Sequence, residues 1–175
     1  FDEDENIDLL RFDVATEFSD DILNAARNLA NSVEDFADDR LRTDLTAVPM
    51  MTIDGQSTQD FDDALSIEKV GDQFRLGVHI VDVGHYVRKG DAIDSEALAR
   101  GSSIYMPDQK ISMLPTELSE GLCSLKAGEL RPAISTLVNL NHSLEIIDFE
   151  ILPSLINVQH QLTYYDVNLV ADKNQ

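Results

Sequence analysis

The chain has 175 residues, 43% of them hydrophobic, which suffices for one domain with a sizeable core, and no apolar run is long enough to span a bilayer. The single cysteine, Cys123, excludes a disulfide framework and a zinc cluster and favours a cytoplasmic location. The formal net charge of −20, from 33 acidic and 13 basic residues, by itself argues against nucleic-acid binding, because affinity for phosphate backbones depends mainly on Lys and Arg.

Residues 1–45 are predicted to form an acidic helical leader or linker. Residues 1–44 hold fourteen Asp and Glu against four Arg, which is typical of a solvated segment. Ser19 is the expected N-cap of a helix, because two aspartates follow it and apolar residues then recur at helical spacing. A second short helix is expected from Ser32, with Asp35 in a weak capping box.

From Met50 onward the pattern changes to strands separated by turns and short helices. Strands are expected at 50–53, 64–70 and 74–83, a helix capped by Asp94 and closed by Gly101, a strand pair within 103–115, a short helix at 116–125, a long hairpin turning at 141–143, and a last helix capped by Thr163. Helices followed by antiparallel strand pairs predict an α+β fold, with a mainly antiparallel sheet in a body over residues 46–175.

The stretch TIDGQSTQDFDDALS, residues 52–66, places Asp54, Asp60, Asp62 and Asp63 close together in sequence. Like charges this close repel unless water or a cation separates them. If the chain bends after Gly55, the four carboxylates converge into a set of hard oxygen ligands that suits Mg²⁺ or Mn²⁺. The spacing does not match a calcium loop of the EF-hand type. From spacing alone, a metal site and a solvated acidic turn are equal alternatives.

Longer motifs decide between these alternatives. The same stretch resembles the start of the catalytic domain in the ribonuclease II and ribonuclease R family. The resemblance continues in order through GVHIVDVGHYVRKGDAID, ARGSSIYMPDQKISMLPTELSEGLCSL and LTYYDV, and it covers roughly residues 45–170. It implies the N-terminal part of an RNB-type catalytic domain, which is far more specific than four aspartates.

The resemblance also implies an activity and site residues. Family members are metal-dependent, hydrolytic 3′→5′ exoribonucleases that act on single-stranded RNA and release 5′-mononucleotides. By motif, Asp54 and Asp63 would hold Mg²⁺, with Mn²⁺ as a possible substitute, and Asp60 and Asp62 would complete the site. Asp62 is expected to be tied most directly to catalysis, with Asp60 beside it. Tyr105 matches the family tyrosine that binds the RNA 3′ end.

Other polar residues are expected to be structural. His79 lies in an apolar strand and is interpreted as a hydrogen-bonded core histidine, and His85 is expected near a surface turn. Cys123 is expected to be a small buried hydrophobe. The cations of the body are too scattered in sequence to define a patch and are expected to form surface ion pairs: Arg88, Lys89, Arg100, Lys110, Lys126 and Arg131.

The family's catalytic domain is longer than this chain. The missing part supplies an arginine beside the scissile phosphate and a second aromatic, and RNA-binding β-barrel domains flank the domain. The resemblance therefore predicts that the chain is a fragment, inactive alone, whose uncovered surface allows self-association. The alternative hypothesis is a non-catalytic RNA-binding or regulatory module that retains the fold.

Overall fold

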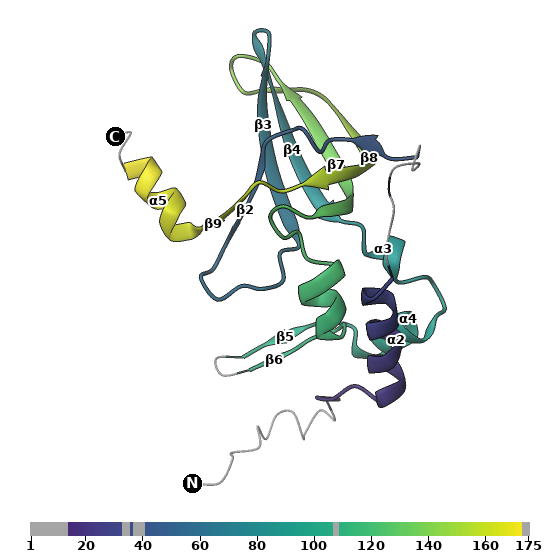
Figure 1. Cartoon of the computed structure of the whole chain (residues 1–175). Coiled ribbons are helices and arrows are strands. Elements are labelled where there is room, and N and C mark those ends of the chain that lie inside the picture. Colours follow the sequence, from purple (N-terminus) through teal and green to yellow (C-terminus); the bar gives the residue numbers. More distant parts are fainter. Residues whose placement is uncertain (1–13, 33–35, 37–40, 107–108, 173–175) are drawn as a thin grey trace.

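The computed structural model describes residues 14–32, 36, 41–106 and 109–172. Its centre is a seven-stranded sheet (Figure 1). In spatial order the strands are β1 (Thr43–Asp44), β8 (Ile146–Asn157), β7 (Leu130–Leu140), β4 (Gln73–Val81), β3 (Asp63–Val70), β2 (Met50–Asp54) and β9 (His160–Thr163). The β1–β8 and β2–β9 pairs are parallel and the other neighbours are antiparallel. The predicted α+β class with a mainly antiparallel sheet is confirmed.

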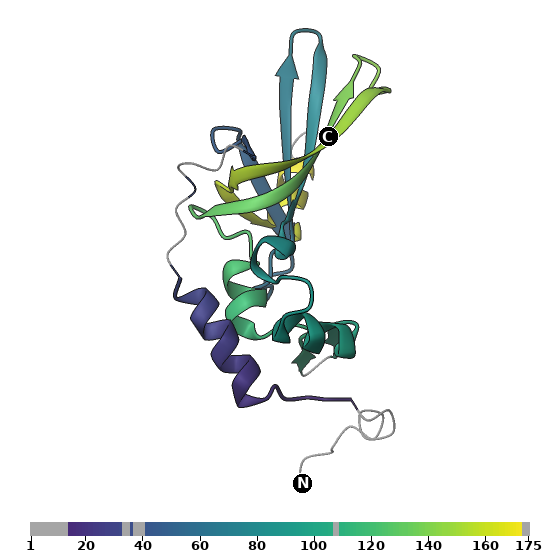
Figure 2. The same ribbon diagram turned by 90° about the vertical axis from the view of Figure 1, so that its right-hand side faces the viewer.

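The remaining elements are short. They are α2 (Asp20–Ala30), α3 (Val83–Tyr86), α4 (Ala92–Arg100), the two-stranded sheet of β5 (Ile104–Tyr105) and β6 (Lys110–Ile111), a π-helical turn η1 (Leu118–Leu122), and α5 (Tyr164–Asp172). Helices α2, α3 and α4 gather at one end of the large sheet, whereas the β3–β4 and β7–β8 hairpins extend away from them (Figures 1 and 2). Among the described residues, no helix is long and apolar enough to cross a membrane.

Ser19 is the N-cap residue of α2, as predicted, but its side chain forms no capping hydrogen bond. Helix α4 is capped by Asp91 and not by Asp94, because the side chain of Asp91 accepts a hydrogen bond from the Asp94 backbone N–H at 2.7 Å. Gly101 closes this helix in the left-handed conformation (φ 74°), as predicted. Thr163 precedes α5 and exchanges hydrogen bonds with Asp166, which confirms it as the cap.

Three elements were not predicted: β1, β9 and α3. Strands β1 and β9 are two and four residues long and pair in parallel with β8 and β2. Such short segments carry no readable periodicity, and their pairing partners are distant in sequence. Most of the helix expected from Ser32, including Asp35, lies outside the described residues.

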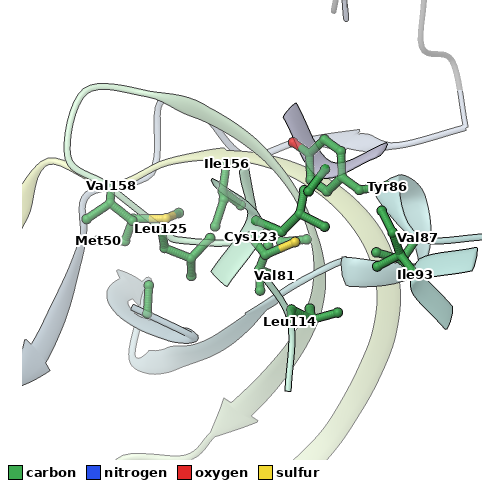
Figure 3. Close-up of a cluster of buried hydrophobic side chains, with 14 residues drawn as sticks. Met50, Val81, Tyr86, Val87, Ile93, Leu114, Cys123, Leu125, Ile156 and Val158 are labelled. Atoms are coloured by element: carbon green, nitrogen blue, oxygen red, sulfur yellow. The ribbon is translucent and has the colours of Figure 1, made fainter. Parts of the chain in front are cut away.

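One hydrophobic core joins the helical end to the sheet (Figure 3). Cys123 is 2% exposed within it, which confirms its prediction as a buried hydrophobe. The segment 114–125 contributes four buried members of the core: Leu114, Leu118, Cys123 and Leu125. The buried members are Ala26, Met50, Ala64, Val81, Tyr86, Val87, Ile93, Leu114, Leu118, Cys123, Leu125, Ala133, Ile156 and Val158.

Arg100 corrects the expectation that the cations form surface pairs. Its side chain is 5% exposed and pairs with Glu96 at 2.8 Å. Its guanidinium also donates to the Ala15 carbonyl at 2.9 Å and lies 3.7 Å from the centre of the Phe18 ring. Arg100 therefore fastens the segment before α2 to α4 by charge, hydrogen bonds and ring contact together.

His79 is fully buried in a row of hydrogen bonds that crosses four strands. Its Nε2 lies 2.9 Å from Ser66 Oγ and its Nδ1 lies 2.6 Å from Ser135 Oγ, which in turn lies 2.6 Å from Ser154 Oγ. This confirms the prediction of a hydrogen-bonded core histidine. Burial lowers the pKa of His79 to about 4, because the surrounding sheet disfavours the charged ring.

Lowering the pH should destabilise the folded state, because His79 is protonated more readily in the unfolded chain. The unfolded histidine takes up its proton near pH 6.5, whereas the folded one does so near pH 4. Between these values the unfolded state binds more protons, so the free energy of unfolding falls by roughly 3 kcal/mol as the pH is lowered. Urea denaturation between pH 7 and pH 4 measures this decline. His142→Gln, at an exposed position, should keep the decline and His79→Asn should lose it; equal declines in both variants would contradict the assignment.

Candidate active site

The four aspartates lie where β2 and β3 separate. Strands β2 and β3 pair only as far as Met51 and Leu65, and β2 continues to Asp54 alongside β9. Asp54 is the last residue of β2 and Asp63 the first of β3, while Asp60 and Asp62 lie in the connecting loop. The bend predicted from the spacing is this loop.

Buried contacts hold the loop in place. The hydroxyl of Ser124 accepts a hydrogen bond from the Phe61 N–H and donates one to the Gln59 carbonyl, each at 3.0 Å. The Leu125 N–H donates to the Phe61 carbonyl at 2.8 Å, and the Val81 N–H donates to the Asp62 carbonyl at 3.1 Å. The segment that follows η1 therefore sets the position of the loop and of its carboxylates.

Ser124→Ala should lower the free energy of unfolding by about 2 kcal/mol, because two buried hydrogen bonds to the loop are lost. Ser119→Ala is the matched control, since the buried Ser119 hydroxyl has no hydrogen-bond partner among the described residues. Chemical denaturation of both variants measures the difference. Equal losses would show that Ser124 does not anchor the loop.

A hairpin brings two further groups to Asp60. Tyr105 and Lys110 are directly opposite each other in the β5–β6 pair. The Tyr105 hydroxyl donates to Asp60 Oδ2 at 3.0 Å, and Lys110 Nζ donates to the same oxygen at 2.6 Å. Sequence analysis predicted Tyr105 but treated Lys110 as a surface cation. The signal that could have found Lys110 was its place in the strand pair expected within 103–115, where it pairs with Tyr105.

These contacts affect the pKa values of Asp60 and Tyr105. Burial raises the pKa of Asp60, but the hydrogen bonds from Lys110 and Tyr105 outweigh burial, so the net shift is downward. Burial and the hydrogen bond to Asp60 raise the pKa of Tyr105 to about 12, so its hydroxyl stays protonated. Tyr105 as a whole is 66% exposed, which leaves its ring accessible to a ligand.

Asp54 and Asp62 are the two aspartates of the cluster whose pKa values are raised. Burial and then the charge of Asp63 raise the pKa of Asp54. Burial and then the charge of Asp60 raise the pKa of Asp62. Oδ2 of Asp54 is buried and accepts no hydrogen bond from the described residues. An unpartnered carboxylate oxygen among like charges is costly, and a cation relieves that cost.

The metal prediction has support from chemistry but not from geometry. As the side chains stand, no three His, Cys, Asp or Glu residues in the described part of the chain are placed to hold a metal ion together. The donor set itself fits a hard dication, since it consists of carboxylate oxygens, one of them buried without a partner. A shared metal held by all four aspartates stays a prediction.

A cavity opens beside these residues. It has a volume of ≈ 380 Å³, and its lining includes Asp60, Asp62 and Tyr105 together with apolar residues such as Ile80 and Met113. The charged and apolar walls suit a ligand with a flat apolar part and an anionic part that is neutralised by a cation.

The fold and this site define a mainly antiparallel α+β domain with a carboxylate cluster and an exposed tyrosine at one cavity. The RNB domain family matches residues 42–175, and the chain belongs to this family. The matched residues include the four aspartates, Tyr105 and Lys110.

Individual relatives agree with this assignment. The chain is 43% identical over 152 residues to ribonuclease R of Mycoplasmopsis pulmonis, which is 87% of this chain and 21% of that protein. It superposes with a TM-score of 0.89 on Mycoplasma genitalium RNase R in complex with ribose-methylated single-stranded RNA, at 28% identity, covering 95% of this chain and 26% of that one. The same relative was also solved with double-stranded RNA. Yeast Ssd1, a pseudonuclease, shares the fold with a TM-score of 0.69 at 24% identity, covering 76% of this chain and 17% of that one.

Proposed function

We propose that this domain provides the active-site carboxylates of a metal-dependent, hydrolytic 3′→5′ exoribonuclease that acts on single-stranded RNA and releases 5′-mononucleotides. The observation that carries the proposal is the arrangement at the cavity, where Tyr105 and Lys110 bind Asp60 beside the loop of repelling carboxylates. The ribonuclease R relatives supply the substrate class. The chain spans about a fifth of the curated relative's length, and the proposed activity belongs to the protein that carries the domain.

Each residue has a proposed role. Asp54, Asp60, Asp62 and Asp63 would hold Mg²⁺ or Mn²⁺, which would supply positive charge to make water nucleophilic and to stabilise the leaving oxygen. Asp62 orients the attacking water. Tyr105 stacks on the terminal base with its exposed ring, and its protonated hydroxyl keeps Asp60 in position.

The proposal is tested with single-stranded RNA labelled at its 3′ end and the protein that carries the domain. In Mg²⁺, the first labelled product should be a 5′-mononucleotide, and a chelator should stop its release. The isolated chain should show little or no hydrolysis. Internal cleavage, or activity that survives chelation, would contradict the proposal.

A second function has one observation in its favour. Lys110 already neutralises Asp60 at 2.6 Å without a metal, so the domain could act as a non-catalytic RNA-binding or regulatory module. Titration with Mn²⁺, followed by electron paramagnetic resonance, separates the two functions. Tight binding that Asp54→Asn abolishes supports the enzyme, whereas RNA binding without Mn²⁺ binding supports the module.

Tyr105→Ala should weaken binding of single-stranded RNA by about 1–3 kcal/mol, or roughly 5- to 150-fold, because the stacking ring is lost. Tyr105→Phe keeps the ring and loses only the hydroxyl bond to Asp60, so it should bind RNA as the unmodified protein does. Fluorescence anisotropy with an oligonucleotide measures both. An alanine variant that binds as tightly as the phenylalanine variant would exclude stacking by Tyr105.

A further inference from the structure

A lysine pairs with one of the four clustered aspartates. Nζ of Lys110 lies 2.6 Å from Oδ2 of Asp60, and the two side chains are only 22% and 15% exposed. Among the described residues, no other Lys, Arg or His forms an ion pair with an aspartate of the cluster. Charges interact more strongly where water is partly excluded. Lys110 is therefore the main positive charge that the described residues bring to the cluster.

The ammonium occupies a position that a bound dication would contest. Oδ2 of Asp60 accepts two hydrogen bonds, from Lys110 at 2.6 Å and from the Tyr105 hydroxyl at 3.0 Å. A carboxylate oxygen has two lone pairs, so both are in use. A Mg²⁺ ion at about 2.0–2.1 Å from either oxygen of Asp60 would lie within a few ångströms of the ammonium. Two positive charges at that separation repel, whereas the neutral hydroxyl of Tyr105 does not oppose the ion.

Glu120 offers the ammonium a second carboxylate. Oε1 of Glu120 lies 3.9 Å from Nζ of Lys110, and Glu120 forms no other ion pair with the described residues. Its side chain is 34% exposed and lines an open cavity of ≈ 570 Å³ together with Gln59 and Lys126. The lysine stem is flexible along its four carbons. Rotation of the side chain alone can therefore bring the ammonium into contact with Glu120.

We propose that Lys110 is a positioning residue that alternates between two carboxylates: it pairs with Asp60 before a dication binds and with Glu120 afterwards. The inference rests on the proposed function, because it takes the four aspartates as ligands of the ion. Before binding, Lys110 holds the carboxylate of Asp60 in place and reduces repulsion within the cluster. Its pairing with Asp60 competes with the ion, so Lys110 sets the dication concentration at which the site fills.

A fixed structural ion pair would have the opposite effect on metal affinity. If Lys110 only anchored the β5–β6 hairpin, its removal would loosen Asp60 and weaken dication binding. If Lys110 competes with the ion, its removal frees Oδ2 and strengthens binding. The sign of the change in affinity therefore separates the two roles, and no measurement of hydrolysis is needed.

The test is a titration of the protein that carries the domain with Mn²⁺, without RNA, followed by the electron paramagnetic resonance signal of the free ion. Lys110→Met and Lys110→Gln should each bind Mn²⁺ about tenfold or more tightly at the site that Asp54→Asn abolishes. Lys69→Met is the charge-matched control. It removes an exposed lysine about 20 Å along β3 from Asp63, well beyond the screening length, and should change the affinity less than about twofold. Unchanged or weaker binding in both Lys110 variants would overturn the inference.

A second substitution tests the alternative partner. Glu120→Gln should weaken Mn²⁺ binding about threefold or more in the unmodified protein, because the displaced ammonium loses its new partner. In the Lys110→Met background the same substitution should have almost no effect. Equal losses in the two backgrounds would show that Glu120 acts only through its own charge, and would overturn the inference. Mn²⁺ binding that is indifferent to Lys110 leaves the proposed function standing, whereas no binding by any variant would reject the proposed metal site and this inference with it.

Discussion

Asp62→Asn is expected to lower RNA hydrolysis by about 10³-fold or more in the protein that carries this domain, while RNA affinity stays within about twofold. The asparagine keeps the shape of the side chain but loses the negative charge that would bind a dication and orient water. RNA contacts through Tyr105 are unaffected. Single-turnover hydrolysis and anisotropy on the same preparation separate the two effects.

The fold should tolerate this change. Burial and neighbouring charges raise the pKa of Asp62, so its ionised form disfavours the folded state at neutral pH, and removing the charge should leave stability equal or higher. Loss of activity together with an unchanged or higher thermal midpoint is therefore the expected combination. Asp72→Asn, in the exposed turn between β3 and β4, is the charge-matched control. Retained hydrolysis in Asp62→Asn would reject its catalytic role.

Gly77→Ala should cause the largest loss of stability, about 3–5 kcal/mol, which is a large fraction of the stability of a typical domain. A Cβ at Gly77 would lie 2.5 Å from His79 Nε2 and 2.8 Å from its Cε1, and would also collide with the Ser66 hydroxyl. Both partners belong to the buried hydrogen-bond row, so neither can move without breaking it. Differential scanning calorimetry should show a midpoint lower by about 10 °C.

Gly84→Ala is the matched control for this substitution. Its Cβ would lie 3.4 Å from Asp82 Oδ1, an ordinary contact, and the position is exposed in α3. Alanine should be neutral or slightly stabilising there. If both variants melt at the same temperature as the unmodified chain, the packing of Gly77 against His79 is not essential.

Local patterns in the sequence predicted the elements that depend on neighbouring residues. The β3–β4 hairpin, helix α2 and the β7–β8 hairpin were predicted because turn residues and periodicity are local signals. Strands β1 and β9 were missed because their partners lie more than a hundred residues away. The cap of α4 was placed at Asp94 in place of Asp91, an error of three residues between two equally suitable aspartates.

In the candidate site, too, some residues were predicted from local sequence and others were not. The sequence placed four aspartates on one bend and identified Tyr105 by resemblance, and the structure brings Tyr105 to Asp60. It did not predict Lys110 or Ser124, because their roles come from segments that meet only after folding. Whether the carboxylates share a metal depends on side-chain positions within a few tenths of an ångström, which spacing does not determine.

Tyr105 and Lys110 bind the same oxygen of Asp60, and this affects how variants at the three positions are interpreted. Because Tyr105 and Lys110 both attach the β5–β6 hairpin to Oδ2 of Asp60, neutralising this carboxylate removes a proposed metal ligand and the hairpin's anchor at once. Substitutions at positions 60, 105 and 110 should therefore be epistatic, and their effects on hydrolysis should not add. A double-mutant cycle between Asp60→Asn and Lys110→Met would separate the anchoring contribution from the chemical one, which neither single variant can report alone.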